Sequence, residues 1–253
     1  MGTVEDSALE AALLSFVTAE QPEVVVASGD LTHRGRAAQH ETAARFLRGL
    51  GRPLVVVPGN HDIPYDASRF TRTFARFEAH WGTTEPVYRS DALHIVGINS
   101  VRSWPSQAGA VSRRQLGRVA DALVDAAPGA LKTVVLHHHL IAAPWRTGKL
   151  PVLRRNRVLG ALVDAGAELI LAGHVHQAAV SERREFEIVS GDDHGVVVST
   201  APGLGQPRPR RRGEARGLHL YEIEPDGVAI ATYIWRLDGW GLVARRRFAR
   251  SPA

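Results

Sequence analysis

Runs of mostly aliphatic residues alternate with amphipathic segments from the start of the chain to Gln177. The runs lie at 24–27, 54–57, 93–98, 132–136 and 169–172. Strands that are buried on both faces of a parallel sheet have this continuous aliphatic character. In the segments between them, apolar residues recur three or four positions apart, which is the spacing of the buried face of a helix. Strands and helices in alternation predict an α/β fold.

Two of the amphipathic segments make specific predictions. Ser112 and Gln115 have the spacing of a capping box, so we expect a helix to begin there. Phe70, Phe74 and Phe77 recur at helical spacing. We therefore expect a helix in this region and expect its rings to pack in the core.

Beyond Gln177 the pattern changes to short apolar segments joined by turns such as Asp226-Gly227. This change predicts a second, mostly antiparallel sheet. Its strands are expected at 186–190, 196–199, 218–223 and 228–233. Because neither a linker-like segment nor a repeat separates the two halves, we expect residues 1–253 to form a single domain.

Composition narrows the chemistry. The chain has 253 residues and no cysteine, which excludes disulfides, thiolate nucleophiles and thiolate zinc sites. No apolar run approaches the roughly 20 residues of a membrane span, and no signal-peptide pattern opens the chain. These features predict a cytoplasmic protein that does not enter a membrane.

The formal charge is +5, and the excess lies in two arginine-rich segments, 208–216 and 245–250. Basic segments of this kind can bind nucleic acid. The first cluster, however, has no interleaved aromatic residues on which bases could stack, so solvated surface arginines explain it better. A small phosphate-bearing substrate would suit the charge equally well, and no oligomeric state is predicted.

Side chains that bind metals follow four of the expected strands. They occur in Gly29-Asp30, Gly59-Asn60-His61-Asp62, the histidine run 137–139 and Gly173-His174-Val175-His176. The carboxyl ends of parallel strands meet at one edge of a sheet, so these motifs should form one site. Oxygen and imidazole ligands suit Mn, Fe or Zn. An imidazole with a pKa near neutrality, such as that of His61, could protonate a leaving group, and Asp62 could orient it.

In this order and at strand ends, these motifs resemble those of the calcineurin-like metallophosphoesterases. The family pattern is Asp-x-His, Gly-Asp, Gly-Asn-His-Asp or Glu, a strand-end His, and Gly-His-x-His. The last four are present between residues 28 and 177. The resemblance implies a four-layer α/β/β/α sandwich. It also implies two divalent metal ions at the carboxyl ends of the central strands.

The resemblance also assigns roles to individual residues. Asp30 would bridge the two metals, and His176 would bind one of them. The other metal would be bound by Asn60, His138 and His174. His61 would be the catalytic histidine that contacts the phosphate, supported by Asp62.

Within the histidine run, we predict that His138 is the ligand. Family members often have His-x-Pro, with the first histidine as ligand, and Leu140 occupies the position of that proline here. This alignment favours His138 over His137. It leaves His139 to pack beside the site.

The Asp-x-His motif of the family is absent from this sequence, and with it the first strand of the fold. Glu5 and Asp6 are better explained as first-turn residues of a helix capped by Thr3 than as replacement ligands. Three explanations are open: a coding start upstream of Met1, which we favour, a centre that retains one metal, or a chain that has lost catalysis. The upstream start requires that the DNA before Met1 encode an in-frame strand ending in Asp-x-His.

The predicted function is metal-dependent hydrolysis of a phosphodiester through a dinuclear centre and a metal-activated water. Within the family, the chain most resembles the bacterial class III cyclic-nucleotide phosphodiesterases, so a 3',5'-cyclic nucleotide is one candidate substrate. Phosphomonoester or nucleotide pyrophosphate hydrolysis are alternatives. A non-catalytic protein that binds metal or phosphate is the alternative from a different class.

Overall fold

The computed structural model describes residues 7–104, 107–185, 195–205, 207, 211–236 and 239–250. In chain order its elements are α1 (Ser7–Glu20), β1 (Val25–Ala27), α2 (Ala37–Gly49), β2 (Leu54–Val56), α3 (Ser68–Thr71), α4 (Ala75–Trp81), β3 (Val87–Arg89), β4 (Leu93–Ile98), α5 (Arg113–Val124), β5 (Leu131–Leu136), α6 (Arg155–Asp164), β6 (Leu169–Ala172), β7 (Ala179–Glu182), a 3-10 turn (Arg183–Glu185), β8 (Val197–Thr200), β9 (Gly217–Glu224), β10 (Gly227–Arg236) and β11 (Gly239–Ala249). All five aliphatic runs form strands, as predicted.

The largest sheet has six strands in the order β3-β4-β5-β6-β8-β7. Its four central strands are parallel, and the two edge strands are antiparallel to their neighbours. The strand predicted at 196–199 corresponds to β8 and joins this parallel sheet beside β6. The expectation that it belongs to the antiparallel sheet was therefore wrong. A run of aliphatic residues does not specify which neighbour a strand will have.

The remaining strands form two smaller groups. β1 and β2 pair in parallel, with Val25 opposite Leu54. β9, β10 and β11 form the antiparallel sheet that the sequence predicted from 218–223 and 228–233. β11 was not predicted, because three consecutive arginines at 245–247 interrupt the apolar pattern, and charged residues of this kind are common on an edge strand.

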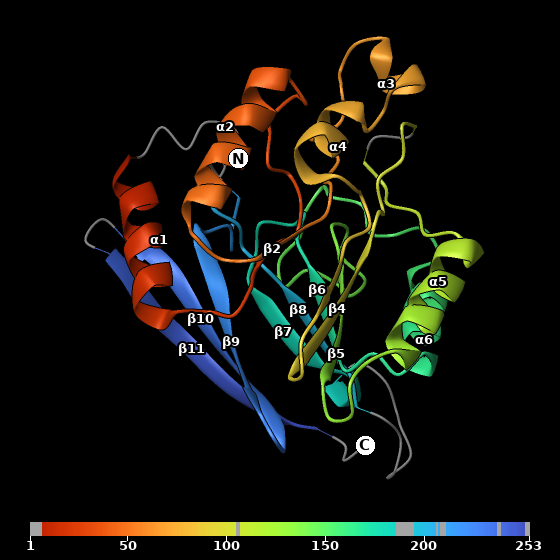
Figure 1. Cartoon of the computed structure of the whole chain (residues 1–253). Coiled ribbons are helices and arrows are strands. Elements are labelled where there is room, and N and C mark those ends of the chain that lie inside the picture. The colour runs from red at the N-terminus through yellow and green to blue at the C-terminus, as the bar shows by residue number, and fades with distance from the viewer. Residues whose placement is uncertain are drawn as a thin grey trace.

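The elements stack in four layers, which confirms the predicted sandwich (Figure 1). Alternate residues of a strand point to opposite faces, so β5 contributes to two cores. Val134 packs against α5 and α6 on the outer face, whereas Val135 packs between the sheets with Val228 and Ile230. The second outer layer consists of α1, α2 and α4, whose apolar faces cover Val56 of β2.

The predicted phenylalanine helix is broken into α3 and α4 by Arg72, whose ψ of 46° is not helical. Because of this break the rings differ in exposure: Phe77 is fully buried, but Phe70 is exposed. The expectation that all three rings pack in the core was thus wrong for Phe70. The capping box of Ser112 and Gln115 is present at the start of α5, as predicted. The helix start at Thr3 and the strand at 186–190 lie outside the described residues.

Arginines of β11, and Arg250 directly after it, make ion pairs with carboxylates of β9, the strand beyond β10, and of nearby loops. Arg247 donates to Glu224 at 2.8 Å and to Asp226 at 2.7 Å, and Arg250 pairs with Glu168 at 2.8 Å. Arg245 and Arg246 pair with Glu222 and Glu185. Most arginines of the second basic segment, 245–250, are therefore paired with carboxylates of the same chain.

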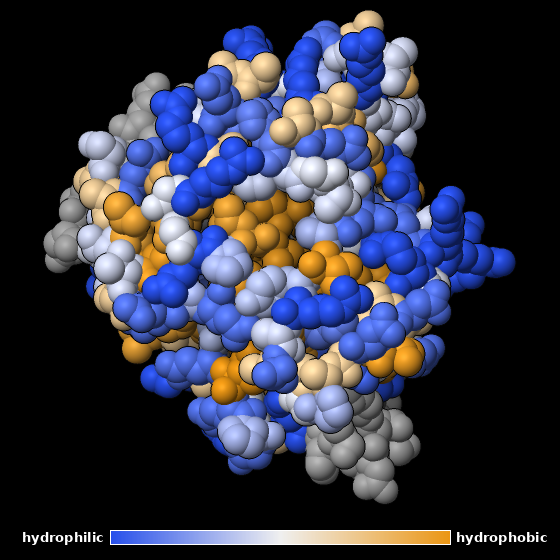
Figure 2. Space-filling model, viewed as in Figure 1, coloured by the Kyte–Doolittle hydropathy of each residue, from blue (hydrophilic) through white to orange (hydrophobic). Residues whose placement is uncertain are grey.

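The face shown in Figure 2 is largely hydrophilic, with an apolar patch near its centre. The sheets are not covered equally: the three apolar residues of β1 are half-buried, whereas all six residues of β4 are buried.

Among the helices that the structure describes, none combines the length and apolar character needed to cross a membrane.

Candidate metal centre

Four loops meet at the carboxyl edge of the strands, and each carries one of the predicted motifs. β1 leads into Asp30, β2 into Asn60, β5 into the histidine run 137–139 and β6 into His174. The loops that carry the four predicted motifs therefore lie close together in the structure. His176 follows on the same loop and is half-buried.

Four donor groups converge around Nε2 of His137. Asp30 Oδ1 lies 3.3 Å from this atom, Asn60 Oδ1 3.2 Å and His174 Nδ1 3.0 Å. Ligands that each lie about 2.1 Å from one ion are themselves separated by about 3.0–3.4 Å, depending on the coordination angle. Each of the three atoms therefore lies at the separation from His137 Nε2 that two ligands of one ion would have.

The backbone is unusual at the same positions. Five non-glycine residues of the described chain have a left-handed φ, and three of them are predicted ligands: Asp30 at 56°, His174 at 71° and His176 at 60°. Left-handed conformations of non-glycine residues are costly, and they concentrate at functional sites. Gly59 permits the close approach of Asp30, because a Cβ at Gly59 would lie 2.1 Å from the Asp30 amide nitrogen.

The structure distinguishes the three consecutive histidines. His137 donates from Nδ1 to the carbonyl of Ser28 at 2.8 Å, which directs its Nε2 to Asp30 and Asn60. His138 instead directs Nδ1 to the hydroxyl of Ser100 at 2.8 Å. Nitrogen atoms of His137, His138 and His174 all lie within 4.8 Å of one another. The motif alignment favours His138, whereas His137 is the histidine of this run whose Nε2 lies 3.3 Å from Asp30 Oδ1.

Electrostatics also suit a cation. Burial by itself would raise the pKa of Asp30, but the charge and hydrogen bond of His137, with the charges of His61 and Lys149, hold that pKa well below its usual range. Burial, reinforced by the neighbouring His137, lowers the pKa of His174 far below its usual range. Asp30 and His174 are thus in the protonation states that bind metal. Burial lowers the pKa of His137, but the charge and hydrogen bond of Asp30 raise that pKa overall, so a metal bound there would displace a proton from the ring.

Unsatisfied polar atoms provide a second test of the fit. His138 Nε2 and His174 Nε2 are buried and have no hydrogen-bond partner among the described residues. Buried polar groups without partners are uncommon, and a metal ion is one standard partner for an imidazole nitrogen of this kind. The donor set therefore fits a divalent metal.

His61 lies at the edge of this centre. Its backbone N–H donates to Asp30 Oδ1 at 3.0 Å, and its Nδ1 lies 2.9 Å from the carbonyl of His33. A carbonyl can only accept, so Nδ1 carries the proton of the neutral ring and Nε2 is the nitrogen left for a substrate. The ring is stacked on His33 at 5.8 Å and on Tyr65 at 6.2 Å.

Asp62 has a different position from the one expected. Its Oδ1 accepts the N–H of Thr32 and its Oδ2 accepts the N–H of Gly59, both at 2.8 Å. We expected Asp62 to orient the His61 ring, but it is the His33 carbonyl that contacts Nδ1 of that ring. The buried carboxylate of Asp62 instead ties the loop after β1 to the loop after β2.

Gln177, which follows the last motif, also has a structural partner. Its buried side-chain amide accepts the N–H of Trp145 at 2.9 Å and donates to the Trp145 carbonyl at 3.3 Å. The guanidinium of Arg212 lies 3.6 Å from the centroid of the Trp145 ring. These contacts hold the loop between β5 and α6 against the metal centre, and sequence patterns offered no signal for them.

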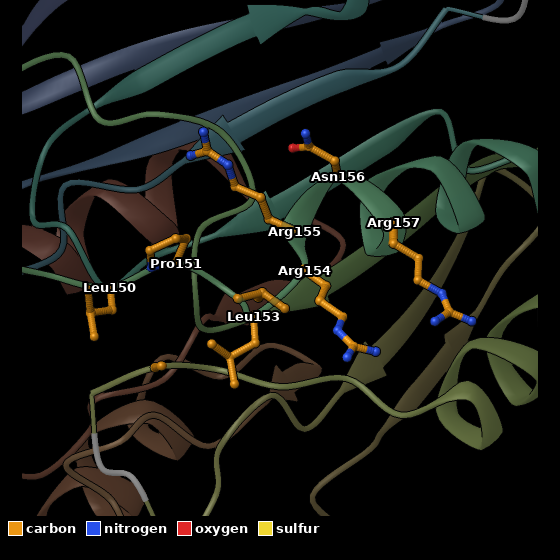
Figure 3. Close-up of a pocket in the computed structure, with 9 residues that line it drawn as sticks. Leu150, Pro151, Leu153, Arg154, Arg155, Asn156 and Arg157 are labelled. Atoms are coloured by element: carbon orange, nitrogen blue, oxygen red, sulfur yellow. The ribbon is translucent and has the colours of Figure 1, made fainter.

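An open pocket lies behind the histidine run and is lined by residues 150–157 with Ala108 (Figure 3). Its wall is attached to the centre, because Val152 donates to the carbonyl of His139 and Leu153 to that of Gly109. Gly109 in turn packs against His138, where a Cβ would lie 2.5 Å from the ring. The pocket is therefore adjacent to the metal centre but does not contain it.

An α/β/β/α sandwich with Asp, Asn and His side chains close together at its strand ends is typical of one class of protein, the metal-dependent hydrolases of phosphate esters. The family profile of the calcineurin-like phosphoesterases matches residues 5–178. The chain belongs to the calcineurin-like phosphoesterase family.

Relatives and solved structures agree with this assignment. A probable cyclic nucleotide phosphodiesterase of Synechococcus is 26% identical over 221 residues, which cover 86% of this chain and 78% of the relative. A second, from Ruthia magnifica, is 26% identical over 66% of this chain and 68% of its own length. A dimetal phosphatase from Danio rerio has a similar fold, with a TM-score of 0.64 and 15% identity over 96% of this chain and 88% of that structure.

Proposed function

We propose that this protein hydrolyses a phosphodiester at a metal centre formed by Asp30, Asn60, His137 and His174. The observation that carries the proposal is the convergence of their donor atoms within 3.0–3.3 Å of His137 Nε2. His137 replaces His138 in the ligand set that the motif predicted. His138 contacts Ser100 through Nδ1 and packs beside His137 and His174.

A second ion is part of the proposal. His176 remains its predicted ligand, with Asp30 as the bridging carboxylate. Divalent metals held here would neutralise the phosphate, activate a water and stabilise the leaving oxygen. Mn, Fe and Zn all suit this oxygen and imidazole donor set.

The protein's own groups supply the remaining steps. His61 is proposed to act as the general acid in its protonated form, in which Nδ1–H stays on the His33 carbonyl and Nε2–H is given to the leaving oxygen. Asp62 maintains the geometry by fixing the two loops that carry Asp30 and Asn60. Lys149 adds positive charge within electrostatic reach of Asp30 and favours an anionic substrate.

Phosphodiesters, including 3',5'-cyclic nucleotides, are the proposed substrates. Support comes from the two relatives named probable cyclic nucleotide phosphodiesterases. Because one fold can host several activities, phosphomonoesters and nucleotide pyrophosphates belong in the same substrate panel.

The direct test is hydrolysis of bis(p-nitrophenyl) phosphate with added Mn, compared among the parent, Asn60→Ala and His61→Ala. Loss of a general acid lowers kcat by about 10²–10⁴-fold, so His61→Ala should retain metal but lose activity to this degree. Asn60→Ala should lose metal as well. Parent activity that both substitutions leave intact would refute the site, and bound metal without turnover would favour a binding protein.

A further inference from the structure

Three large aromatic side chains are exposed in one region of the surface, and one of them, Tyr65, stacks on His61. Tyr65 is 52% exposed, Phe70 61% and Trp104 76%. Single exposed apolar residues are common on protein surfaces, but clustered ones more often mark a binding site. Phe70 is also the ring that sequence periodicity assigned to the core, so its exposure needs a separate reason.

The rings form a connected group across two loops. Phe70 of α3 lies 6.4 Å from Trp104, which belongs to the segment after β4. Arg69 links the same two loops, because its Nε donates to the carbonyl of Ser103 at 2.7 Å and its guanidinium lies 5.6 Å from the Tyr65 ring. Figure 1 shows α3 and the segment after β4 next to each other above the sheet.

Tyr65 connects this group to the catalytic histidine. Its hydroxyl lies 3.1 Å from Nδ1 of His61, and the two rings are stacked with an interplanar angle of 22°. If His61 protonates the leaving oxygen, the group attached to that oxygen must lie on the His61 side of the centre. The aromatic group thus borders the position of the leaving alcohol.

We infer that Tyr65, Arg69, Phe70 and Trp104 form a recognition surface for the nucleobase of the ester that is hydrolysed; the inference rests on the proposed function. Exposed rings offer flat faces for a heteroaromatic base, and such stacking is tolerant of base identity. Arg69 supplies a planar cation among them, which can stack on a base or attract a phosphate. A glycerol-type alcohol offers no face to stack.

The test compares two diesters, 3',5'-cyclic AMP and glycerophosphoethanolamine. Trp104→Ala and Phe70→Ala should each raise KM for cyclic AMP about 5- to 100-fold relative to KM for the glycerol diester, with kcat little changed. Trp104→Phe keeps an aromatic face and should restore most of the preference. Val124→Ala, at an exposed apolar position on α5, is the matched control and should change neither KM.

If KM for the two diesters changes equally in Trp104→Ala and Phe70→Ala, the inference is overturned while the proposed function stands. If the parent hydrolyses no phosphate ester, the proposed function fails, and the surface is tested separately by calorimetry with AMP. Binding of AMP to the parent that weakens at least 5-fold in Trp104→Ala would support the surface. No binding to the parent, or equal binding to both, would overturn it and would favour a protein partner for the exposed rings.

Discussion

Replacing Asp62 by alanine should destabilise the protein as well as impair the metal centre. The carboxylate is fully buried and accepts two backbone N–H groups at 2.8 Å, from Thr32 and Gly59. A hydrogen bond to a charged group contributes about 1.5–3 kcal/mol, and the substitution would leave both donors buried without a partner. The expected loss is therefore about 3–5 kcal/mol of unfolding free energy.

For a chain of this size, 1 kcal/mol shifts Tm by about 2–4 °C, so Asp62→Ala should lower Tm by about 6–20 °C. Scanning calorimetry with EDTA present would measure the shift without a contribution from metal binding. Asp91→Ala, at an exposed position, is the control and should change stability by less than about 0.5 kcal/mol.

A Tm within about 2 °C of the parent would refute the bracing role of Asp62. Normal stability combined with lost turnover would restore the catalytic role that the motif suggested. Asp62→Asn separates the two effects further. An amide oxygen can accept one of the two N–H groups, but its NH₂ must face the other, so we expect an intermediate loss of stability.

Three further predictions concern the centre, its covering loop and a distant histidine. His137→Ala should weaken Mn binding more than His138→Ala does, because the loss of a residue outside the ligand set lowers metal affinity by only about 10–100-fold. Metal content after dialysis measures both variants, and the reverse order would restore His138 as the ligand. Gln177→Ala removes two hydrogen bonds to Trp145 and should speed tryptic cleavage after Arg146 or Lys149. The control Gln107→Ala should not change the rate, and equal cleavage rates in the two variants would argue that Gln177 does not hold this loop in place. Burial lowers the pKa of His219 below the 6.5 of the unfolded chain, although its hydrogen bond to Thr200 opposes this. As the pH falls through 6.5, His219 therefore becomes protonated in the unfolded state before it does in the folded state. The unfolding free energy is highest above pH 6.5 and decreases as the pH falls from 6.5 to the pKa of the folded state. His219→Gln should flatten the decline in unfolding free energy between pH 7 and 5, measured by urea titration; an unchanged slope would contradict this.

Sequence alone determined the parts of this protein that depend on local periodicity and on strand ends. Continuous aliphatic runs predicted β1, β2, β4, β5 and β6, because residues buried on both faces of a sheet must be apolar throughout. The motifs were expected at the edge of one sheet, but β1 and β2 pair separately from β5 and β6, so the site lies where the strand ends of two sheets meet. The structure accordingly brings Asp30, Asn60 and His174 together.

Tertiary structure decided what neighbouring residues of similar chemistry do. His137 and His138 are equivalent by composition, and only their partners distinguish them: Nδ1 of His137 contacts the Ser28 carbonyl, which directs its Nε2 to Asp30, whereas Nδ1 of His138 contacts the Ser100 hydroxyl. Helical spacing likewise could not separate Phe77 from Phe70. The break at Arg72 rotates Phe70 out of the core and places it beside Trp104, which comes from a distant part of the chain. Periodicity reports which face of an element is apolar, but the partner of that face depends on contacts between residues far apart in sequence.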